Sequence, residues 1–405
     1  MFRHLNRANS ILNNTILSIF KDREGDLWLG LDNGIAHVEV ESPVSLYADN
    51  TGELGTVYAI SGSVDSLLLG SNHGLFQWQG GKIQQVPGSQ GQVWDITKIG
   101  HRYLVGHNDG FYEFESGNFQ KINEVTGGWR LFKSRFNGTY LQATYTGIAT
   151  YRSITNLETP RYIPGLTKPI RDAVEESPTI LWAADNYRGL YRISGGNYSE
   201  KVDNITENQQ FPNDYNVKLV RFNQRVYSLI QQQWYEYDQA SGKLVQSKWL
   251  NKALEGVSDV FQISDREILI NARGILYRVN LDGRKFQWKI IPPKYYIGKL
   301  VAGNTRAFKT NKAMLINLDD GFLVVSGVGN VAAKIKVEGF SSGKLIQNGQ
   351  SIGYGKAVQL RVISDAFGYK KPSVYFRVDN GKAVNPVANG RIVLNNLAGG
   401  THRVV

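Results

Sequence analysis

Short apolar segments alternate with turns rich in Gly, Asn and Asp along most of the chain. No window of a dozen residues keeps the i, i+3, i+4 apolar spacing of an amphipathic helix without a Gly or a strand-type alternation. Apolar runs of this length, bounded by turn residues, are typical of β-strands. The pattern therefore predicts an all-β protein.

These segments recur as a unit in which two apolar strands joined by a turn are followed by Gly and a hydrophobic residue. A period near 40 residues with four short strands per unit is typical of a β-propeller. One unit cannot bury both of its faces alone, so the copies are expected to stack around an axis. The repeat glycines are Gly34, Gly74, Gly110, Gly147, Gly189, Gly274 and Gly321, and a degenerate copy at 226–237 has Gln233-Trp234 instead.

The first copy predicts the layout of a unit. Residues 15–20 form the inner strand, and residues 27–30 form the second strand after a turn that ends at Gly25. Asn33-Gly34 makes the hairpin to a third strand, and residues 44–47 form the fourth, outer strand. Trp28 and Trp182 occupy the same mid-strand position of two copies, so both are assigned to the core.

Two blade counts fit the eight copies. Eight blades would use residues 12–326 and close through an outer strand near residues 1–5. Seven blades would leave the first copy to a propeller upstream of this sequence. Because an open ring exposes unpaired strand edges, one of these closures is required.

A boundary near residue 330 separates the propeller, residues 1–328, from a second domain, residues 331–405. The 40-residue period stops there, and strands continue without it. We expect a small, immunoglobulin-like β-sandwich, cut short at its C-terminal end. Its expected strands are 332–338, 357–364, 373–378, 391–394 and 401 onward.

Composition and charge exclude several function classes. The chain has 405 residues, 46 Lys and Arg against 35 Asp and Glu, and no Cys. Without Cys there is no disulfide, thiolate zinc site or Cys nucleophile. Most of the excess positive charge falls in 331–405, where it is scattered along strands rather than clustered with aromatics. It fits a solvated surface or a nearby anionic membrane, and we expect no nucleic-acid binding.

No catalytic or metal-binding constellation stands out. The histidines lack metal-ligand spacing, and adjacent carboxylates such as Glu175-Glu176 point to opposite faces of a strand. Residues 22–26 superficially resemble a calcium loop but lack its alternating acidic oxygens and closing Glu, which favours a turn. We therefore predict no enzyme activity, no metal and no cofactor, although a propeller hydrolase or lyase could still assemble its site from several blades.

The candidate binding residues lie where inner strands begin, at the mouth of the predicted channel. Trp94 and Trp129 each follow a Gly-rich connection at the start of an inner strand, and Arg171 and Asp172 open a later one. Tyr145 lies in the hairpin of the blade between. Stacking of these rings on a sugar or an apolar ligand is one interpretation, and packing between blades is the other.

The repeats resemble a known family. Residues 13–35, with an acidic turn followed by Gly-Asp-Leu-Trp-Leu-Gly and then Gly-Ile, resemble the two-component regulator propeller repeat. Residues 91–94, 106–110, 126–129 and 143–147 resemble the second propeller of large bacterial sensor-regulators. The end of the chain, at 374–378 and 392–404, resembles the three-Tyr sandwich that follows such propellers. It departs from that pattern in its tyrosines, with Phe376 beside Tyr375 and His402 near the end.

The resemblance implies a periplasmic sensor region of a single-pass bacterial signalling protein. It would bind a small molecule or an oligosaccharide and pass the signal through the sandwich to a histidine-kinase or helix-turn-helix output. The sequence contains no signal peptide, membrane span or output domain, and it stops in what looks like a strand, so we expect a fragment. Tethering through a missing membrane segment and a homodimer are also expected. The alternative function is a protein-interaction scaffold.

Overall fold

The computed structural model describes residues 5–8, 10–23, 25–40, 42–283, 285–326, 334–365, 375–382, 391–395 and 397–404. The chain separates into two compact units, Met1–Ser326 and Gly327–Val405. In both units the regular secondary structure of the described residues is almost entirely antiparallel β-strand, as the sequence predicts. Within the described residues no helix is long and apolar enough to cross a membrane.

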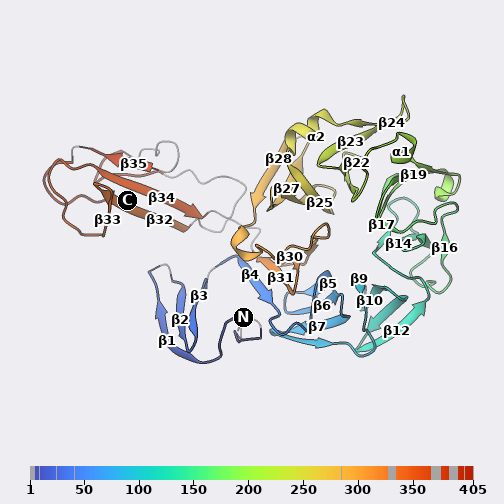
Figure 1. Cartoon of the computed structure of the whole chain (residues 1–405), viewed down its shortest axis with the longest axis horizontal. Helices are drawn as coiled ribbons and strands as arrows, with labels where there is room; N and C mark the ends of the chain where they lie inside the picture. The colour runs from blue at the N-terminus through green and yellow to red at the C-terminus, as the bar shows by residue number, and fades with distance from the viewer. Residues whose placement is uncertain are drawn as a thin grey trace. The chain divides into compact units, whose positions relative to one another are not determined.

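The first unit contains seven four-stranded antiparallel sheets arranged radially around a common centre (Figure 1). Each sheet contacts the next, and the last contacts the first, so the circle is closed. The order within each sheet is sequential except in the last. The sheets are β5 (Val57–Ser63), β6 (Ser66–Ser71), β7 (Leu75–Gln79) and β8 (Lys82–Gln85); β9 (Val93–Ile99), β10 (Arg102–His107), β11 (Phe111–Glu115) and β12 (Asn118–Asn123); β13 (Arg130–Lys133), β14 (Tyr140–Thr144), β15 (Gly147–Tyr151) and β16 (Arg161–Tyr162); β17 (Ile170–Ser177), β18 (Ile180–Asp185), β19 (Leu190–Ser194) and β20 (Lys201–Asn204); β21 (Lys218–Phe222), β22 (Arg225–Ile230), β23 (Gln233–Asp238) and β24 (Lys243–Gln246); β25 (Val257–Ser264), β26 (Glu267–Ala272), β27 (Ile275–Asp282) and β28 (Lys285–Ile290); and β29 (Ala307–Lys309), β30 (Ala313–Leu318), β31 (Gly321–Ser326) and β4 (Val44–Ala48).

The closing strand corrects the expected assignment of residues 44–47. They do not complete the first copy, because β4 pairs antiparallel with β31, with Tyr47 opposite Phe322. The ring is closed by an early strand added to the last sheet, which covers an edge of β31 that would otherwise be unpaired. Of the alternative closing strand near residues 1–5, residues 1–4 lie outside the described residues.

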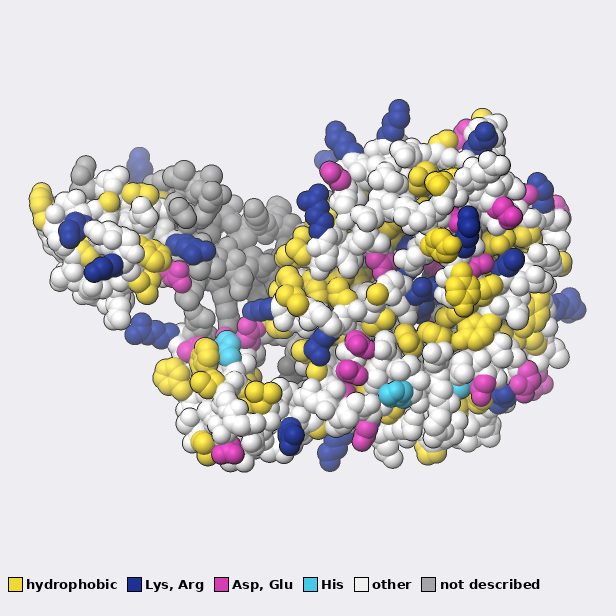
Figure 2. Space-filling view, in the orientation of Figure 1, with side chains coloured by type: hydrophobic (Ala, Val, Ile, Leu, Met, Phe, Trp, Pro, Cys, Tyr) yellow, Lys and Arg dark blue, Asp and Glu magenta, His cyan; other side chains and the backbone are white. Residues whose placement is uncertain are grey.

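The first repeat copy forms a separate three-stranded sheet of β1 (Ile16–Lys21), β2 (Leu27–Leu31) and β3 (Gly34–Val38), which lies outside the ring (Figure 1). Leu5 and Ile11 cover part of one face. The other face leaves apolar side chains exposed, visible as a hydrophobic patch in Figure 2. Trp28 is among them with 43% of its surface accessible, so its assignment to the core is wrong, whereas Trp182 is buried as predicted.

The core of the ring lies between neighbouring sheets. Leu69 and Phe76 of one sheet, for example, pack against Leu315 and Phe322 of the next. The same arrangement recurs around the circle, because strands that are buried on both faces need apolar residues on both. Short helical turns connect some of the strands: η1 (Gly196–Tyr198) lies within one sheet, between β19 and β20, while α1 (Ile205–Asn208), α2 (Lys248–Ala253) and η2 (Pro293–Tyr295) lie between successive sheets.

The second unit has one four-stranded sheet in its described residues, in the order β33 (Lys344–Ile346), β32 (Lys334–Ser341), β34 (Val358–Asp365) and β35 (Arg391–Leu394). Leu360 and Ile392 form its core together with Phe376 and Val378. In the described part of the expected strands at 373–378 and from 401, Val378 forms an antiparallel bridge with Val404, and Phe376 is also a bridge residue. Residues 332–333 and 373–374 lie outside the described residues.

Candidate functional site

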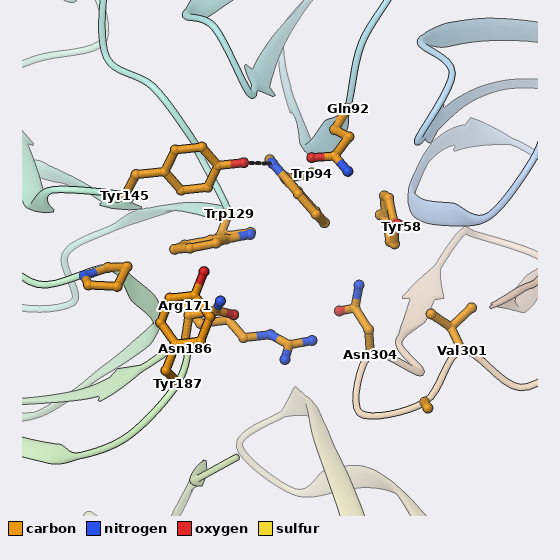
Figure 3. Close-up of a pocket in the computed structure, with 12 residues that line it drawn as sticks. Tyr58, Gln92, Trp94, Trp129, Tyr145, Arg171, Asn186, Tyr187, Val301 and Asn304 are labelled. Atoms are coloured by element: carbon orange, nitrogen blue, oxygen red, sulfur yellow. Dashed lines mark hydrogen bonds between the residues drawn. The ribbon is translucent and has the colours of Figure 1, made fainter. Parts of the chain in front are cut away.

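A cavity of about 660 Å³ opens at the centre of the ring (Figure 3). Its volume lies in the range of small-molecule sites. Five of the seven sheets, or the loops that adjoin them, contribute to its wall. The lining residues are Tyr58, Gln92, Trp94, Trp129, Tyr145, Pro169, Arg171, Asn186, Tyr187, Val301, Ala302 and Asn304.

A β-bulge aims three of these side chains into the cavity. The pairing of β5 with β6 skips Tyr58, the pairing of β9 with β10 skips Trp94, and the pairing of β17 with β18 skips Arg171. A bulged residue leaves the strict alternation of the strand, so its side chain can be redirected. The same irregularity at Ser258 in β25 indicates that it belongs to the repeat rather than to one blade.

Four aromatic rings form a continuous arc along one wall of the cavity. Tyr58 and Trp94 have ring centroids 4.6 Å apart, Trp94 and Trp129 6.0 Å, and Trp129 and Tyr145 4.7 Å. Trp94 Nε1 donates to Tyr145 Oη at 2.9 Å, which fixes both rings (Figure 3). Trp129 is only 5% exposed, so it mainly packs between blades, while Trp94 and Tyr58 present more surface. Packing between blades therefore accounts for Trp129, while Trp94 and Tyr58 keep surface that faces the cavity.

Among the described residues, Arg171 is the only charged side chain that lines the cavity. Its Nη2 donates to the carbonyl oxygen of Gly303 at 2.6 Å, and Lys218 Nζ donates to the same oxygen at 2.5 Å. Burial lowers the pKa of Arg171, and it lowers the pKa of Lys218 to about 8, although Asp259 opposes both shifts. Two cations thus adjoin at the base of the cavity.

A layer of paired charges lies behind the lining residues. Asp172 forms an ion pair with Arg130, and Asp259 lies 3.3 Å from Lys218. Arg306 donates weakly to the carbonyls of Trp94 and Trp129, at 3.3 and 3.4 Å, and therefore ties two pocket strands together. Burial lowers its pKa to about 10.

Asp95 supports the same two strands from below. It accepts hydrogen bonds from the Leu131 amide at 2.9 Å and from Thr97 Oγ1 at 3.1 Å. Burial raises the pKa of Asp95, while the Leu131 amide and Arg306 oppose the shift. The bond to Leu131 joins β9 to β13, so the spacing of Trp94 and Trp129 is fixed by a buried polar contact.

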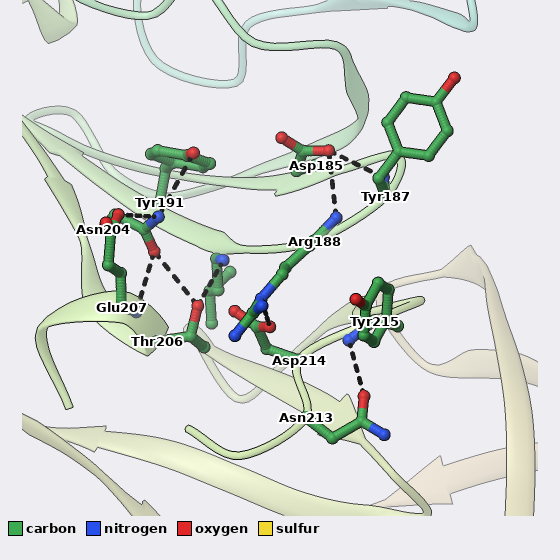
Figure 4. Close-up of polar contacts among 11 residues, drawn as sticks. Asp185, Tyr187, Arg188, Tyr191, Asn204, Thr206, Glu207, Asn213, Asp214 and Tyr215 are labelled. Carbon is green, nitrogen blue, oxygen red and sulfur yellow. Dashed lines mark hydrogen bonds and ion pairs between the residues drawn. The ribbon is translucent and has the colours of Figure 1, made fainter. Parts of the chain in front are cut away.

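Tyr187 is carried by a loop that is fixed from behind (Figure 4). Asp185 accepts from the backbone amides of Tyr187 and Arg188, at 2.7 and 3.2 Å. Arg188 Nε in turn donates to Asp214 at 2.7 Å, and its guanidinium lies over the Tyr215 ring. The Tyr187 side chain itself remains 67% exposed and available at the mouth of the cavity.

The structure brings together four of the five residues that the sequence selected. Trp94, Trp129, Tyr145 and Arg171 line one cavity, whereas Asp172 points away from it and pairs with Arg130. The bulge at Arg171 turns that side chain into the cavity and leaves Asp172 on the side of Arg130. The sequence analysis did not select Tyr58, which occupies the same bulge position as Trp94. It also did not select the loop residues Asn186, Tyr187 and Asn304. Alignment of the inner strands could have found Tyr58.

Among the described residues, Asp22, Asp26 and His37 are the group whose spacing could hold a metal ion. The two oxygens of Asp22 accept from the Asp26 amide and from Trp28 Nε1, both at 3.0 Å, and Asp26 accepts from the Val40 amide. These bonds stabilise the turn between β1 and β2. The geometry therefore agrees with the turn that the sequence predicts at residues 22–26.

Comparison with known proteins gives a likeness in structure only. No protein-family model and no curated protein sequence matches the chain. Two structures of the extracellular domain of BT4673 from B. thetaiotaomicron, described as a one-component system in one case and a hybrid two-component system in the other, match it with a TM-score of 0.50 and 11% identity over 98% of this chain. The extracellular domain of the hybrid two-component system BT3049 from the same organism matches 96% of this chain and 69% of its own, with a TM-score of 0.41 and 14% identity.

What they share is the fold. The chain spans 60% to 61% of the length of the BT4673 domains. At this identity the likeness to the BT4673 domains concerns the fold alone, and it agrees with the all-β, propeller-like architecture that the repeats predict.

Proposed function

We propose that this chain is the extracytoplasmic, ligand-sensing region of a bacterial signal-transduction protein, and that the central cavity binds the ligand, a small molecule or an oligosaccharide. The observation that carries the proposal is the convergence of bulged side chains from three separate sheets on one cavity. The bulge belongs to the repeat, but at Tyr58, Trp94 and Arg171 the redirected side chains face one common cavity. An arc of aromatic rings with a few polar groups suits a sugar or a similar ring.

The proposal includes the finer architecture. The seven four-stranded sheets would form a complete seven-bladed propeller, with β1–β3 outside it. The second unit would be an immunoglobulin-like sandwich of the three-Tyr type, in which the segment with Phe376 and Val378 supplies the layer that covers β34 and β35. The likeness to extracellular domains of bacterial signalling systems supports a position outside the cytoplasm, in the periplasm.

Binding rather than catalysis is the activity that the lining residues favour. They include aromatic rings, amides and one guanidinium, but no carboxylate or imidazole. Glycoside hydrolysis uses a pair of carboxylates, and most other propeller chemistry needs a general base within reach of the substrate. The ring therefore has the groups to hold a ligand and orient it.

Transmission is proposed to run from the ring through the second unit to a membrane segment, within a homodimer. A ligand can shift such an equilibrium only through its different affinity for two arrangements. Small-angle scattering of the free and the ligand-saturated protein tests this step. Distinct profiles are expected, and superimposable profiles at saturation would argue against it.

The ligand site is tested by a thermal-shift screen with oligosaccharides and metabolites. A ligand at one hundred times its Kd stabilises the folded state by about 2.7 kcal/mol. The expected hit raises the Tm of the unaltered protein but not of Tyr187→Ser, which removes an exposed lining ring. Tyr354→Ser, an equally simple change at a ring 87% exposed in the second unit, is the matched control and should keep the response. A response that survives Tyr187→Ser and Trp94→Phe together would contradict the site.

A further inference from the structure

The cavity has one charged group, and no carboxylate of the described residues forms an ion pair with it. Arg171 extends from β17 into the open space between Trp129 and Asn304 (Figure 3). Its bond to the Gly303 carbonyl holds the guanidinium in place. Guanidinium carries five N–H donors in a planar fork that matches the oxygens of an anion. Arg171 is therefore held in position at the cavity wall, without an ion-pair partner among the described residues.

The carboxylates nearest to Arg171 are bound to other groups. Asp172 pairs with Arg130 and also accepts from the Ala173 amide. Asp259 pairs with Lys218 and accepts from the Val260 amide at 2.9 Å. Both carboxylates lie near enough to favour the charge of Arg171, but their ion pairs are with Arg130 and Lys218.

The remaining carboxylates of the centre are no better placed to neutralise Arg171. Asp95 is occupied by the Leu131 amide and by Thr97. Asp319 lies at the exposed side of Tyr58 and accepts from Thr56 Oγ1 at 2.5 Å. Solvent screens a charge at such an exposed position more strongly than one inside the cavity.

Two further cations reinforce the field at Arg171. Lys218 shares the Gly303 carbonyl with it, and Arg306 lies behind the strands of Trp94 and Trp129. Burial disfavours each of these charges, as the lowered pKa of all three groups indicates. A bound anion would offset this cost, whereas a neutral ligand would bury the cations further without compensation.

We propose that the ligand carries a negatively charged group, a carboxylate or a sulfate, that pairs with Arg171 while its neutral body lies against the arc of Tyr58 and Trp94. The amides of Gln92, Asn186 and Asn304 supply the neutral hydrogen bonds around that body. The inference rests on the proposed function, because it names the ligand class of the same cavity. It selects acidic sugars and small organic acids over neutral ones.

Matched pairs of acid and neutral compound test the charge preference at constant ionic strength. Suitable pairs are glucuronate with glucose, digalacturonate with galactobiose, and indole-3-acetate with indole-3-acetamide, each titrated by calorimetry. The acid of the binding pair should bind at least about tenfold tighter than its neutral partner, since a hydrogen-bonded charge pair contributes that much. Arg171→Met should remove the preference, and Arg171→Lys should keep part of it. Arg225→Met, at an exposed arginine paired with Glu236, is the control.

The outcomes separate the inference from the proposed function. A neutral compound that binds as tightly as its acid, or an acid that binds Arg171→Met unchanged, overturns the anionic ligand but leaves the cavity as a ligand site. Acid binding that is unchanged by Arg171→Met and also by Trp94→Phe overturns both.

Fluorescence quenching tests the same charge without any ligand. The contribution of Trp94 is obtained as the difference between the unaltered protein and Trp94→Phe, and it is quenched with iodide, caesium and acrylamide. The quenching constant of each ion is divided by that of acrylamide, which is neutral. The normalised constant for Trp94 should be larger for iodide than for caesium, and Arg171→Met should reduce the ratio of iodide to caesium quenching. Equal quenching by the two ions, or stronger quenching by caesium, overturns the inference even if no compound of the panel binds.

Discussion

The ring and the sheet β1–β3 are built from the same sequence repeat, yet only in the ring are the apolar side chains of the repeat buried on both faces of the sheet. Trp28 and Trp182 can be compared directly, because each lies in the second strand of its unit. Each donates its indole N–H to a carboxylate six residues earlier, Trp28 to Asp22 at 3.0 Å and Trp182 to Glu176 at 2.7 Å. Trp182 is nevertheless 2% exposed and Trp28 43%. The local sequence determines the hairpin and its hydrogen bonds, while burial depends on a neighbouring sheet.

The same contrast applies to the bulge that builds the cavity. The pairing of β1 with β2 skips Leu17, as the ring sheets skip Tyr58, Trp94 and Arg171. Leu17 is 67% exposed and is not among the described residues that line the central cavity. A bulge redirects one side chain, and a site forms only where several redirected side chains face a common centre.

Removal of β4 should have the largest effect. A deletion of residues 1–40 removes β1–β3 and leaves β4 on β31, so the ring should still unfold cooperatively with a Tm close to that of the whole chain. A deletion of residues 1–49 removes the closing strand as well and exposes the edge of β31, so it should aggregate or lose its cooperative transition. Circular dichroism melts and size-exclusion chromatography distinguish the two. Equal behaviour of both deletions would contradict closure by β4.

The two repeat tryptophans should differ in their contribution to stability. Trp182→Ala empties a buried site that packs against Ala184 and Leu219 and should lower the free energy of unfolding by about 3 to 5 kcal/mol. Trp28→Ala, at the equivalent position, should cost less, about 1 to 2 kcal/mol, because its ring is already partly in water. Urea denaturation of both variants measures the difference. Comparable losses would mean that another surface covers Trp28 in solution.

A glycine in the second strand of the sheet should show a smaller difference in stability between the ring and the sheet β1–β3. A Cβ at Gly106 would overlap the backbone carbonyl of Gly128 in the next sheet, whereas a Cβ at Gly30 would meet the side chain of Ser18 in its own sheet. Gly106→Ala should therefore cost about 1 to 3 kcal/mol through overpacking and should displace Trp129. Gly30→Ala should cost less, because a serine side chain can rotate away. Urea melts, together with the near-ultraviolet dichroism of the tryptophans, check both effects.

The pH dependence of stability should report the buried Lys218. Its pKa is lowered from 10.5 to about 8 by burial, which Asp259 opposes and Arg171 and Arg306 reinforce. On raising the pH through 8, the folded protein loses this proton before the unfolded chain does, so the free energy of unfolding contributed by Lys218 rises. The unaltered protein should gain about 1 kcal/mol relative to Lys218→Met between pH 7.5 and 9. A parallel pH profile of the two proteins would show that Lys218 remains charged.

Much of the fold could be predicted from the sequence because the repeat carries it. Gly34 and its counterparts mark the hairpins, and the Leu-Trp-Leu run at 27–29 marks a second strand. Closure through β4 could not be predicted, since residues 44–47 are as compatible with β3 as with β31, and only the ring geometry decides between them. The exposure of Trp28 could not be predicted either, because the sequence of one repeat does not show whether another sheet packs against it.

The sequence could predict those residues of the candidate site that occupy a fixed position in the repeat. Trp94, Trp129 and Arg171 were selected because they begin inner strands, and these positions face the centre. Asp172 was misplaced because the bulge at Arg171 decides which of the two neighbouring residues enters the cavity. The loop residues Tyr187 and Asn304 have no fixed place in the repeat, so only the structure brings them to the cavity.

Fluorine NMR of the protein labelled with 5-fluorotryptophan tests the central claim most directly. Signals of Trp28, Trp94, Trp129 and Trp182 are assigned by single substitution to Phe, and an acidic compound that stabilises the protein is titrated. The account predicts that the signals of Trp94 and Trp129 shift together along one binding curve, while those of Trp28 and Trp182 stay in place. A ligand that shifts Trp28 or Trp182 and leaves Trp94 and Trp129 unchanged would contradict the central cavity as the sensing site.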